Sequence, residues 1–178
     1  MELIIIDLNK EKIDVDLLYN KLPENIKQRV DRYKIAEDRI RSIVAWSIVH
    51  EKVDLNDKQV YYNQNGKPYI KDQYFSISHS HNFVGVLFDT KECGFDIEKV
   101  IKRDDKVARK ILDEKNLKVY NSMPDVLIKN WTQIEAYGKA LGIGIRLDMV
   151  QNLPDDIITE NVIDSLGDKY YYSIYIRE

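Results

Sequence analysis

Two acidic residues lie close together in a segment with the pattern of a β-strand. Asp96 and Glu98 alternate with apolar residues in the sequence Gly-Phe-Asp-Ile-Glu-Lys that covers positions 94–99. Side chains two positions apart point to the same face of a strand, so the two carboxylates converge while the apolar side chains face the core. Two ionised carboxylates side by side repel each other unless a cation lies between them. The segment therefore predicts a site for a hard divalent cation such as Mg²⁺, although two surface acids on a solvated edge strand would give the same pattern.

A third acid occurs in a helical segment near the C-terminus. Glu135 and Lys139 are four positions apart in the sequence Trp-Thr-Gln-Ile-Glu-Ala-Tyr-Gly-Lys that covers positions 131–139. Residues with this spacing lie on one face of a helix, one turn apart. The pair brings an acid and a base together for chemistry, but an ordinary surface ion pair has the same spacing.

The elements that must position these residues follow from the hydrophobic periodicity. An Ile-rich N-terminal segment predicts a buried strand, and apolar residues at three- and four-residue steps predict a helix around Ile40, Ile43, Val44 and Ile48. The strands at 74–79, 82–89 and 93–100 are predicted to form an antiparallel meander. The fold class is therefore expected to be α+β. The other predicted elements are a strand at 2–7, helices at 16–20, 23–33, 104–111, 114–120 and 126–141, a turn at 65–66 and a closing strand at 169–176.

Composition excludes several classes of protein. The chain has 178 residues, 44% of them hydrophobic, which suffices for the core of one domain. The formal net charge of −3 argues against a nucleic-acid-coating protein. The longest apolar runs, at 3–6 and 83–88, are much shorter than the ~18 residues of a membrane span. The single cysteine and the N-terminal run, which has no basic region, favour the cytoplasm.

Taken together, the acidic motifs resemble the signature of the 4′-phosphopantetheinyl transferases, in particular the surfactin-type branch. That signature is Gly-x-Asp-x-Glu followed by Trp-Ser/Thr-x-Lys-Glu-Ala/Ser-x-x-Lys. Three further segments resemble this branch in the same order along the chain. They are Ala-Glu-Asp-Arg-Ile-Arg-Ser at 36–42, Gly-Lys-Pro at 66–68 and Phe-Ser-Ile-Ser-His-Ser at 75–80.

The resemblance implies a transferase that binds coenzyme A and Mg²⁺ and moves the phosphopantetheine arm to a serine of a carrier protein. By matching positions, Asp96, Glu98 and Glu135 are expected to be metal ligands, and Lys139 is expected to approach the pyrophosphate. The family also uses a glutamate between the two motifs as a base, for which Glu114 is the nearest candidate, and a metal-bound water is the other possibility. The residues expected to contact coenzyme A are Lys67, Ser78, His79, Arg41 and Ser42, with Lys27 or Arg29 as a further source of charge.

The fold implied by the resemblance is pseudo-dimeric, with similar halves at 1–98 and 99–178 and the site between them. A monomer is then expected, with an acyl or peptidyl carrier protein as partner and neither nucleic acid nor membrane. Basic residues on two predicted helices are candidate contacts for that partner, or simply a solvated face, and these are Lys106, Lys110, Lys115 and Lys118.

One position departs from the family pattern. Ile134 stands where the family usually has a lysine, which removes a cation expected near the phosphates. The alternative prediction is therefore a degenerate relative that binds coenzyme A or a carrier protein without catalysis.

Overall fold

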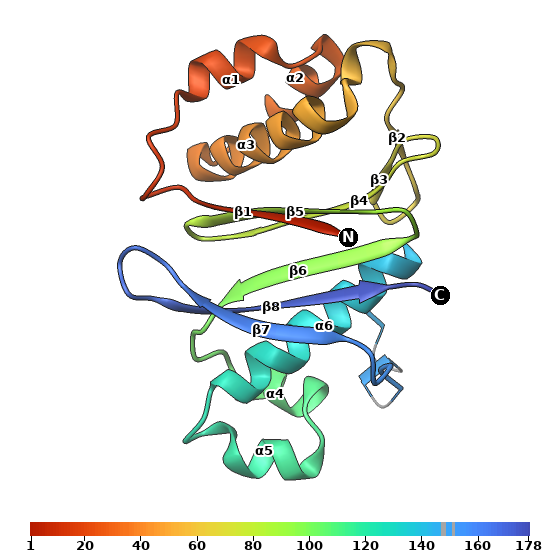
Figure 1. The fold of residues 1–178 in the computed structure, drawn as a ribbon. Coiled ribbons are helices and arrows are strands. Elements are labelled where there is room, and N and C mark those ends of the chain that lie inside the picture. Colours follow the sequence, from red (N-terminus) through yellow and green to blue (C-terminus); the bar gives the residue numbers. More distant parts are fainter. Residues whose placement is uncertain (147–148, 151) are drawn as a thin grey trace.

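Two three-stranded antiparallel sheets face each other, and helices cover the outer face of each sheet (Figure 1). The computed structural model describes residues 1–146, 149–150 and 152–178. The four layers are therefore helices, sheet, sheet and helices, and both kinds of element alternate along one chain. This arrangement confirms the predicted α+β class.

The first sheet has the strand order β1-β5-β4; the longest helix of this half packs on its outer face, and two shorter helices pack on that helix. Its core is the apolar stripe of the longest helix, in which Ile43, Val44 and Ile48 are buried against the sheet, as the periodicity predicted. The elements of this half are β1 (Glu2–Asp7), α1 (Val15–Lys21), α2 (Glu24–Val30), α3 (Ala36–Val53), β4 (Tyr74–Ser80) and β5 (Phe83–Asp89).

The second sheet repeats this topology with the strand order β6-β8-β7. In each half the first strand is followed by three α-helices and then by two strands, and the last strand lies in the centre of the sheet. The two halves are therefore similar. The elements of the second half are β6 (Cys93–Lys99), α4 (Asp105–Ile111), α5 (Glu114–Tyr120), α6 (Asp125–Leu141), β7 (Ile158–Ile163) and β8 (Lys169–Ile176).

Short elements lie between α3 and β4. A 3₁₀ turn, η1 (Leu55–Asp57), is followed by a small hairpin of β2 (Tyr61–Tyr62) and β3 (Pro68–Tyr69). The predicted turn at Asn65 and Gly66 lies in this hairpin, and Gly66 adopts a φ of 81°, which favours glycine. The hairpin carries Lys67 toward the second half of the molecule.

The predicted meander is wrong in its third strand. β4 and β5 pair as expected, but β6 pairs with β8 and belongs to the other sheet. The chain thus changes sheet in the turn at 90–92, which is earlier than the division after residue 98 expected from the resemblance. The strand β7 was not predicted, because exposed polar residues interrupt its alternation.

The inner faces of the two sheets share one apolar core. Phe83 and Leu87 of β5 pack with Phe95 of β6 and with Tyr170 and Ile174 of β8. Each sheet therefore buries the inner face of the other. Among the described residues, no helix combines the length and the apolar character that a membrane span needs.

β4 and β6 lie side by side where the edges of the two sheets meet, and serine hydroxyls connect them. We call Ser76, Ser78 and Ser80 of β4 the serine ladder. Their hydroxyl oxygens accept hydrogen bonds from three backbone N–H groups of β6, those of Phe95 (3.0 Å), Ile97 (3.4 Å) and Lys99 (3.2 Å). The ladder thus holds the acidic strand against the first half of the molecule.

Candidate active site

A cavity of about 350 Å³ lies at the junction of α3, β4, β6 and α6. The three predicted acids and the predicted lysine all line it, although they come from two elements of the second half. The other lining residues come mainly from the first half and are Arg29, Tyr33, Ser42, Ala45, Trp46, Pro68, Ile77, Ser78 and His79. The structure therefore brings both acidic motifs to one place between the halves.

Asp96 is held by one of its two carboxylate oxygens. Its Oδ1 accepts hydrogen bonds from the Ser78 hydroxyl at 2.7 Å and from the Lys139 ammonium at 2.7 Å. Its Oδ2 is buried and has no hydrogen-bond partner in the described part of the chain. Because the residue is only 3% exposed, this oxygen needs a polar or charged partner. Such an atom is what a cation-binding site would present.

Glu98 is held in a similar way. Its Oε2 accepts a hydrogen bond from the Ser80 hydroxyl at 2.9 Å and lies 3.4 Å from a guanidinium nitrogen of Arg103. Burial, and then the charge of Asp96, raise the pKa of Glu98, while Ser80 and Arg103 oppose that rise. The ionised form of Glu98 thus depends on the positive charge and hydroxyl groups around it.

Glu135 and Lys139 lie one turn apart on α6, as their spacing predicted. Burial raises the pKa of Glu135 to about 7; the neighbouring Lys139 lowers it, and Asp96 and Glu98 raise it further. Three carboxylates therefore share one cavity whose lining holds two cations, Lys139 and Arg29. An additional cation would relieve this imbalance.

Among the described residues, no three His, Cys, Asp or Glu side chains are grouped closely enough to hold a metal ion. Lys139 binds Asp96 Oδ1 instead. The donor chemistry fits nevertheless, because the available atoms are carboxylate oxygens and one of them, Asp96 Oδ2, is buried without a partner. Oxygen donors of this kind, few in number, suit Mg²⁺.

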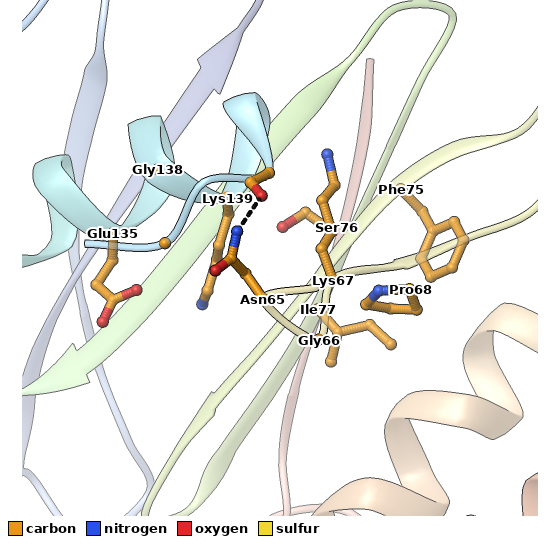
Figure 2. A pocket seen from close by; sticks show the side chains of 12 residues that line it. Asn65, Gly66, Lys67, Pro68, Phe75, Ser76, Ile77, Glu135, Gly138 and Lys139 are labelled. Carbon is orange, nitrogen blue, oxygen red and sulfur yellow. Dashed lines mark hydrogen bonds between the residues drawn. The ribbon is translucent and has the colours of Figure 1, made fainter. Parts of the chain in front are cut away.

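A second cavity of about 240 Å³ lies beside the first and shares Pro68, Ile77, Glu135 and Lys139 with it. Figure 2 shows the elements that line it: α6 contributes Glu135 and Lys139, the hairpin of β2 and β3 contributes Asn65, Gly66 and Lys67, and β4 adds three residues. The Asn65 amide closes the pocket by donating a hydrogen bond to the Gly142 carbonyl at 2.9 Å. The hairpin is therefore anchored to the C-terminal end of α6.

Lys67 lines this second cavity, but its ammonium already has partners. It lies 2.8 Å from a Glu92 carboxylate oxygen and 3.2 Å from the Ala140 carbonyl. A phosphate would have to compete with Glu92, which is a surface residue. Lys67 thus lines the cavity beside the predicted site, with its ammonium held by Glu92 and α6.

Ser42 and His79 also lie where a nucleotide could reach them. Both line the first cavity. Burial, and then the charge of Arg41, lower the pKa of His79, so its ring is neutral at neutral pH. Arg41 is not a lining residue of this cavity in the described structure, because it binds the His81 carbonyl at 2.9 Å and Asp38 at 2.6 Å. Of the two further basic candidates, Arg29 lines the cavity, whereas Lys27 donates to the Asn20 carbonyl.

The structure does not bring Glu114 to the acids. It is the first residue of α5, it is exposed, and it lines neither cavity. Asp113 caps this end of α5 by accepting a hydrogen bond from the Asn116 N–H.

Ile134 occupies the core and not the cavity. It is 1% exposed and packs in the apolar cluster of α4, α5 and α6 with Ile111, Leu127 and Tyr120. Sequence reasoning treated this position only as a missing cation. The structure supplies a packing reason for an apolar residue there.

Two residues that hold the acids were missed by sequence reasoning. The strict alternation of serines at 76, 78 and 80 marks one face of a strand, and that signal would have placed Ser80 beside Ser78. No local signal points to Arg103, because it reaches Glu98 from the loop before α4.

Comparison with known proteins gives the site a context. No protein-family model matches the chain. A 4′-phosphopantetheinyl transferase called gsp, from Aneurinibacillus migulanus, is 27% identical over 177 residues, which cover 90% of this chain and 75% of that protein. The 4′-phosphopantetheinyl transferase Sfp from Bacillus subtilis is 24% identical over 128 residues, which cover 69% of this chain and 57% of that protein. The chain is thus a relative of the surfactin-type 4′-phosphopantetheinyl transferases.

Proposed function

We propose that the protein transfers the 4′-phosphopantetheine arm of coenzyme A to a serine of an apo carrier protein. The observation that carries this proposal is the convergence of Asp96, Glu98, Glu135 and Lys139 on one cavity between the halves. The names of the two relatives support the same reaction class.

The reaction exchanges one phosphorus–oxygen bond for another. The serine oxygen of the carrier forms a bond to the phosphorus that bears pantetheine, and the bond from that phosphorus to the bridging oxygen breaks. Adenosine 3′,5′-bisphosphate leaves with the bonding electrons, and the serine proton goes to a base. The site must therefore neutralise phosphate charge, align the hydroxyl group and accept a proton.

The residues of this chain account for the first task. Asp96, Glu98 and Glu135 would hold Mg²⁺, which when bound stabilises negative charge on the pyrophosphate. Lys139 is a second cation and lies 2.7 Å from Asp96, at the boundary of the two cavities. In this position its ammonium would contact a phosphate that lies against the acids.

Coenzyme A would lie along the two adjoining cavities. Arg29, Ser42, Ser78 and His79 line the first and Lys67 lines the second, which supports phosphate contacts along this path. The neutral ring of His79 would act as a hydrogen-bonding group toward a phosphate oxygen. Arg41 would support the same end of the cavity from beside His79.

Glu114 is not proposed as the base, since it lies outside both cavities.

We further propose that the protein acts in the cytoplasm on an acyl or peptidyl carrier protein. We also propose that it is a monomer, because residues of both halves of one chain already line the site. The alternative function is binding of coenzyme A or a carrier protein without transfer. The one observation that favours it is that neither Ile134 nor Glu114 contributes to the cavity.

The experiment is the intact mass of an apo carrier protein after incubation with this protein, coenzyme A and Mg²⁺. We expect a gain of one phosphopantetheine, about 340 Da, that is lost with a chelator and in Asp96→Asn and Glu135→Gln. Glu2→Gln is the matched control, since Glu2 is an exposed acid paired with Lys52 far from the cavity. Stabilisation of the protein by coenzyme A without any mass gain in several carriers would support the binding alternative and overturn the transferase.

A further inference from the structure

The two acids of β6 are held by two sets of residues built on the same plan. Asp96 Oδ1 is bound by Ser78 of β4 and by the cation Lys139. Glu98 Oε2 is bound by Ser80 of β4 and by the cation Arg103. In each set a serine of the ladder and one cation share a single carboxylate oxygen. The sets are two residues apart on both strands, so they face the same way.

The serine hydroxyls have two roles that depend on each other. The Ser80 oxygen accepts the Lys99 N–H at 3.2 Å, and its hydroxyl proton is directed to Glu98 at 2.9 Å. A hydroxyl group has one proton and an ionised carboxylate only accepts, so in this contact the Ser80 proton goes to Glu98; the Ser80 oxygen also lies 3.3 Å from His81 Nδ1. The ladder therefore presents a hydrogen-bond donor to Glu98 at a defined position on β4.

Contacts other than its ion pair with Glu98 also hold Arg103 in position. The buried Tyr120 hydroxyl accepts a hydrogen bond from the Arg103 N–H at 3.0 Å and donates one to the Arg103 carbonyl at 2.7 Å. The guanidinium carbon lies 5.9 Å from the centre of the Trp131 ring, one turn before Glu135 on α6. The Arg103 Nε is buried without a hydrogen-bond partner among the described residues. The hydrogen bonds of Tyr120 to the Arg103 backbone and the neighbouring Trp131 ring thus keep the guanidinium beside Glu98.

We propose that Ser80 and Arg103 are positioning residues that hold Glu98 by Oε2 and so leave its Oε1 for the divalent cation of the site. This inference rests on the proposed function, because it concerns how the metal ligands of that function are oriented. Groups that hydrogen-bond to a metal ligand fix its orientation, and their removal weakens metal binding. Neither residue was among the predicted site residues, and both act through Glu98.

The test is a titration of the metal-free protein with Mn²⁺ alone. Binding is measured by electron paramagnetic resonance, as the decrease in the signal of free Mn²⁺. We expect Ser80→Ala and Arg103→Gln each to weaken Mn²⁺ binding about tenfold or more. Arg103→Lys retains a cation that can reach Glu98 and should recover most of the affinity. The fold of each variant is checked by circular dichroism and thermal melting.

Two matched controls separate positioning from general damage. Ser76→Ala removes a hydroxyl from the same ladder, one that binds the Phe95 N–H and no acid. Arg39→Gln removes an arginine that, like Arg103, pairs with an acid and lies over an aromatic ring, here Asp31 and Tyr19. Both controls should bind Mn²⁺ as the unmodified protein does.

A double-mutant cycle tests whether the two residues act through Glu98. In a Glu98→Gln background, Ser80→Ala and Arg103→Gln should cause no further loss of Mn²⁺ affinity. Unchanged affinity in the single variants would overturn the inference and leave the proposed function in place. An equal loss in Ser76→Ala would also overturn it, since the ladder would then act only by packing. Failure of the unmodified protein to bind Mn²⁺ would overturn the metal site of the proposed function and this inference with it.

Discussion

Lys139 supplies positive charge in the cavity that three carboxylates line. Its ammonium lies 2.7 Å from Asp96 and 3.0 Å from the Ser78 hydroxyl, and its charge lowers the pKa of Glu135. The Asp96 side chain is 4% exposed and that of Lys139 is 27% exposed, so the pair is screened by water only from one side. Removing the lysine would leave a buried acid with a single hydroxyl partner.

Lys139→Met should therefore destabilise the metal-free protein by about 1 to 3 kcal/mol, because a buried charge loses its partner. Urea unfolding without divalent cations measures the change. The control is Lys52→Met, since Lys52 forms an exposed ion pair with Glu2, and it should change the free energy of unfolding by less than about 0.5 kcal/mol. Equal stability of Lys139→Met and the unmodified protein would show that the acids are balanced without this lysine.

Ile134→Lys offers a second prediction at this scale. Since Ile134 is buried among the apolar residues of α4, α5 and α6, we expect the lysine to destabilise the protein by about 2 to 4 kcal/mol and not to add a cation to the cavity. Urea unfolding and the carrier mass assay together measure this. Ile134→Met, which keeps the volume, should cost less than about 1.5 kcal/mol. A stable Ile134→Lys protein with faster transfer would contradict the packing explanation.

At the scale of elements, the contact between β6 and α6 decides whether the two acidic motifs meet. A Cβ atom on Gly94 would lie 1.8 Å from the Ala136 carbonyl oxygen and 2.6 Å from the Ala140 nitrogen, both of them backbone atoms of α6. The helix can therefore lie on the strand only where the strand has glycine. This explains physically why the acidic motif begins with Gly94.

We expect Gly94→Ala to destabilise the protein by about 3 kcal/mol or more, because the backbone of α6 must move away from β6. The same movement separates Glu135 from Asp96, so carrier modification should fall with stability. Urea unfolding and the mass assay measure the two effects. Gly167→Asn is the comparison: a side chain there strains the backbone, whose φ is 88°, but nothing lies within 4 Å of a Cβ atom, so its cost should be smaller. A Gly94→Ala protein as stable as Gly167→Asn would contradict the close packing.

The first turn of α6 is tied to β8 by an ion pair that responds to pH. Asp125 binds the Lys169 ammonium at 2.6 Å and the Tyr171 hydroxyl at 3.0 Å. These hydrogen bonds, that of Lys169 foremost, lower the pKa of Asp125 from its ordinary value of 3.8. Folding thus favours the ionised form, so the stabilisation is present above that value and is lost as the pH falls through the lower pKa of the folded state.

Asp125→Asn should lower the melting temperature at about pH 7 by a few degrees at most, because the pair is partly exposed to water, and the difference should shrink toward about pH 3. Thermal melts of both proteins across that range measure it. Asp16→Asn changes an acid in the first turn of α1 and should show a smaller difference at neutral pH. A difference for Asp125→Asn that persists unchanged at low pH would assign the effect to something other than charge.

At the scale of the whole molecule, the repeated topology creates two junctions between the halves. β4 and β6 meet at the serine ladder. By position in the two sheets, β7 corresponds to β4 and β1 corresponds to β6, and these two strands both line a cavity of about 640 Å³ elsewhere on the molecule. Only the first junction carries the two acids of β6 and the two residues of α6. The inner faces of both sheets pack in one apolar core. Separation of the two halves would therefore expose this core to water.

The two tryptophans make this coupling measurable. Trp46 lies in α3 of the first half, and Trp131 lies in α6 of the second. In the single-tryptophan variants Trp131→Phe and Trp46→Phe, fluorescence reports on one half each. If the protein unfolds as one cooperative unit, the fluorescence midpoint in urea of each variant should coincide with that variant's circular dichroism midpoint. Fluorescence that changes before or after the circular dichroism in either variant would show that the halves unfold separately.

The sequence by itself determined the local parts of this site. Alternation along β6 places Asp96 and Glu98 on one face, and helical spacing places Glu135 one turn from Lys139, because both relations depend only on backbone periodicity. The helices and most strands follow from the same signals. The resemblance of the motifs to a transferase signature further predicted that the two local patterns form one site.

Only the tertiary structure decided how these parts are arranged. Periodicity cannot tell which strand pairs with which, so β6 was predicted beside β5 although it pairs with β8. It also cannot show that Ile134 faces a core, that Glu114 lies at a solvent-exposed helix end, or that Arg103 reaches Glu98. Each of these outcomes depends on contacts between segments far apart in the chain, whose free energy is set by the burial of apolar surface and the pairing of charges in the assembled fold.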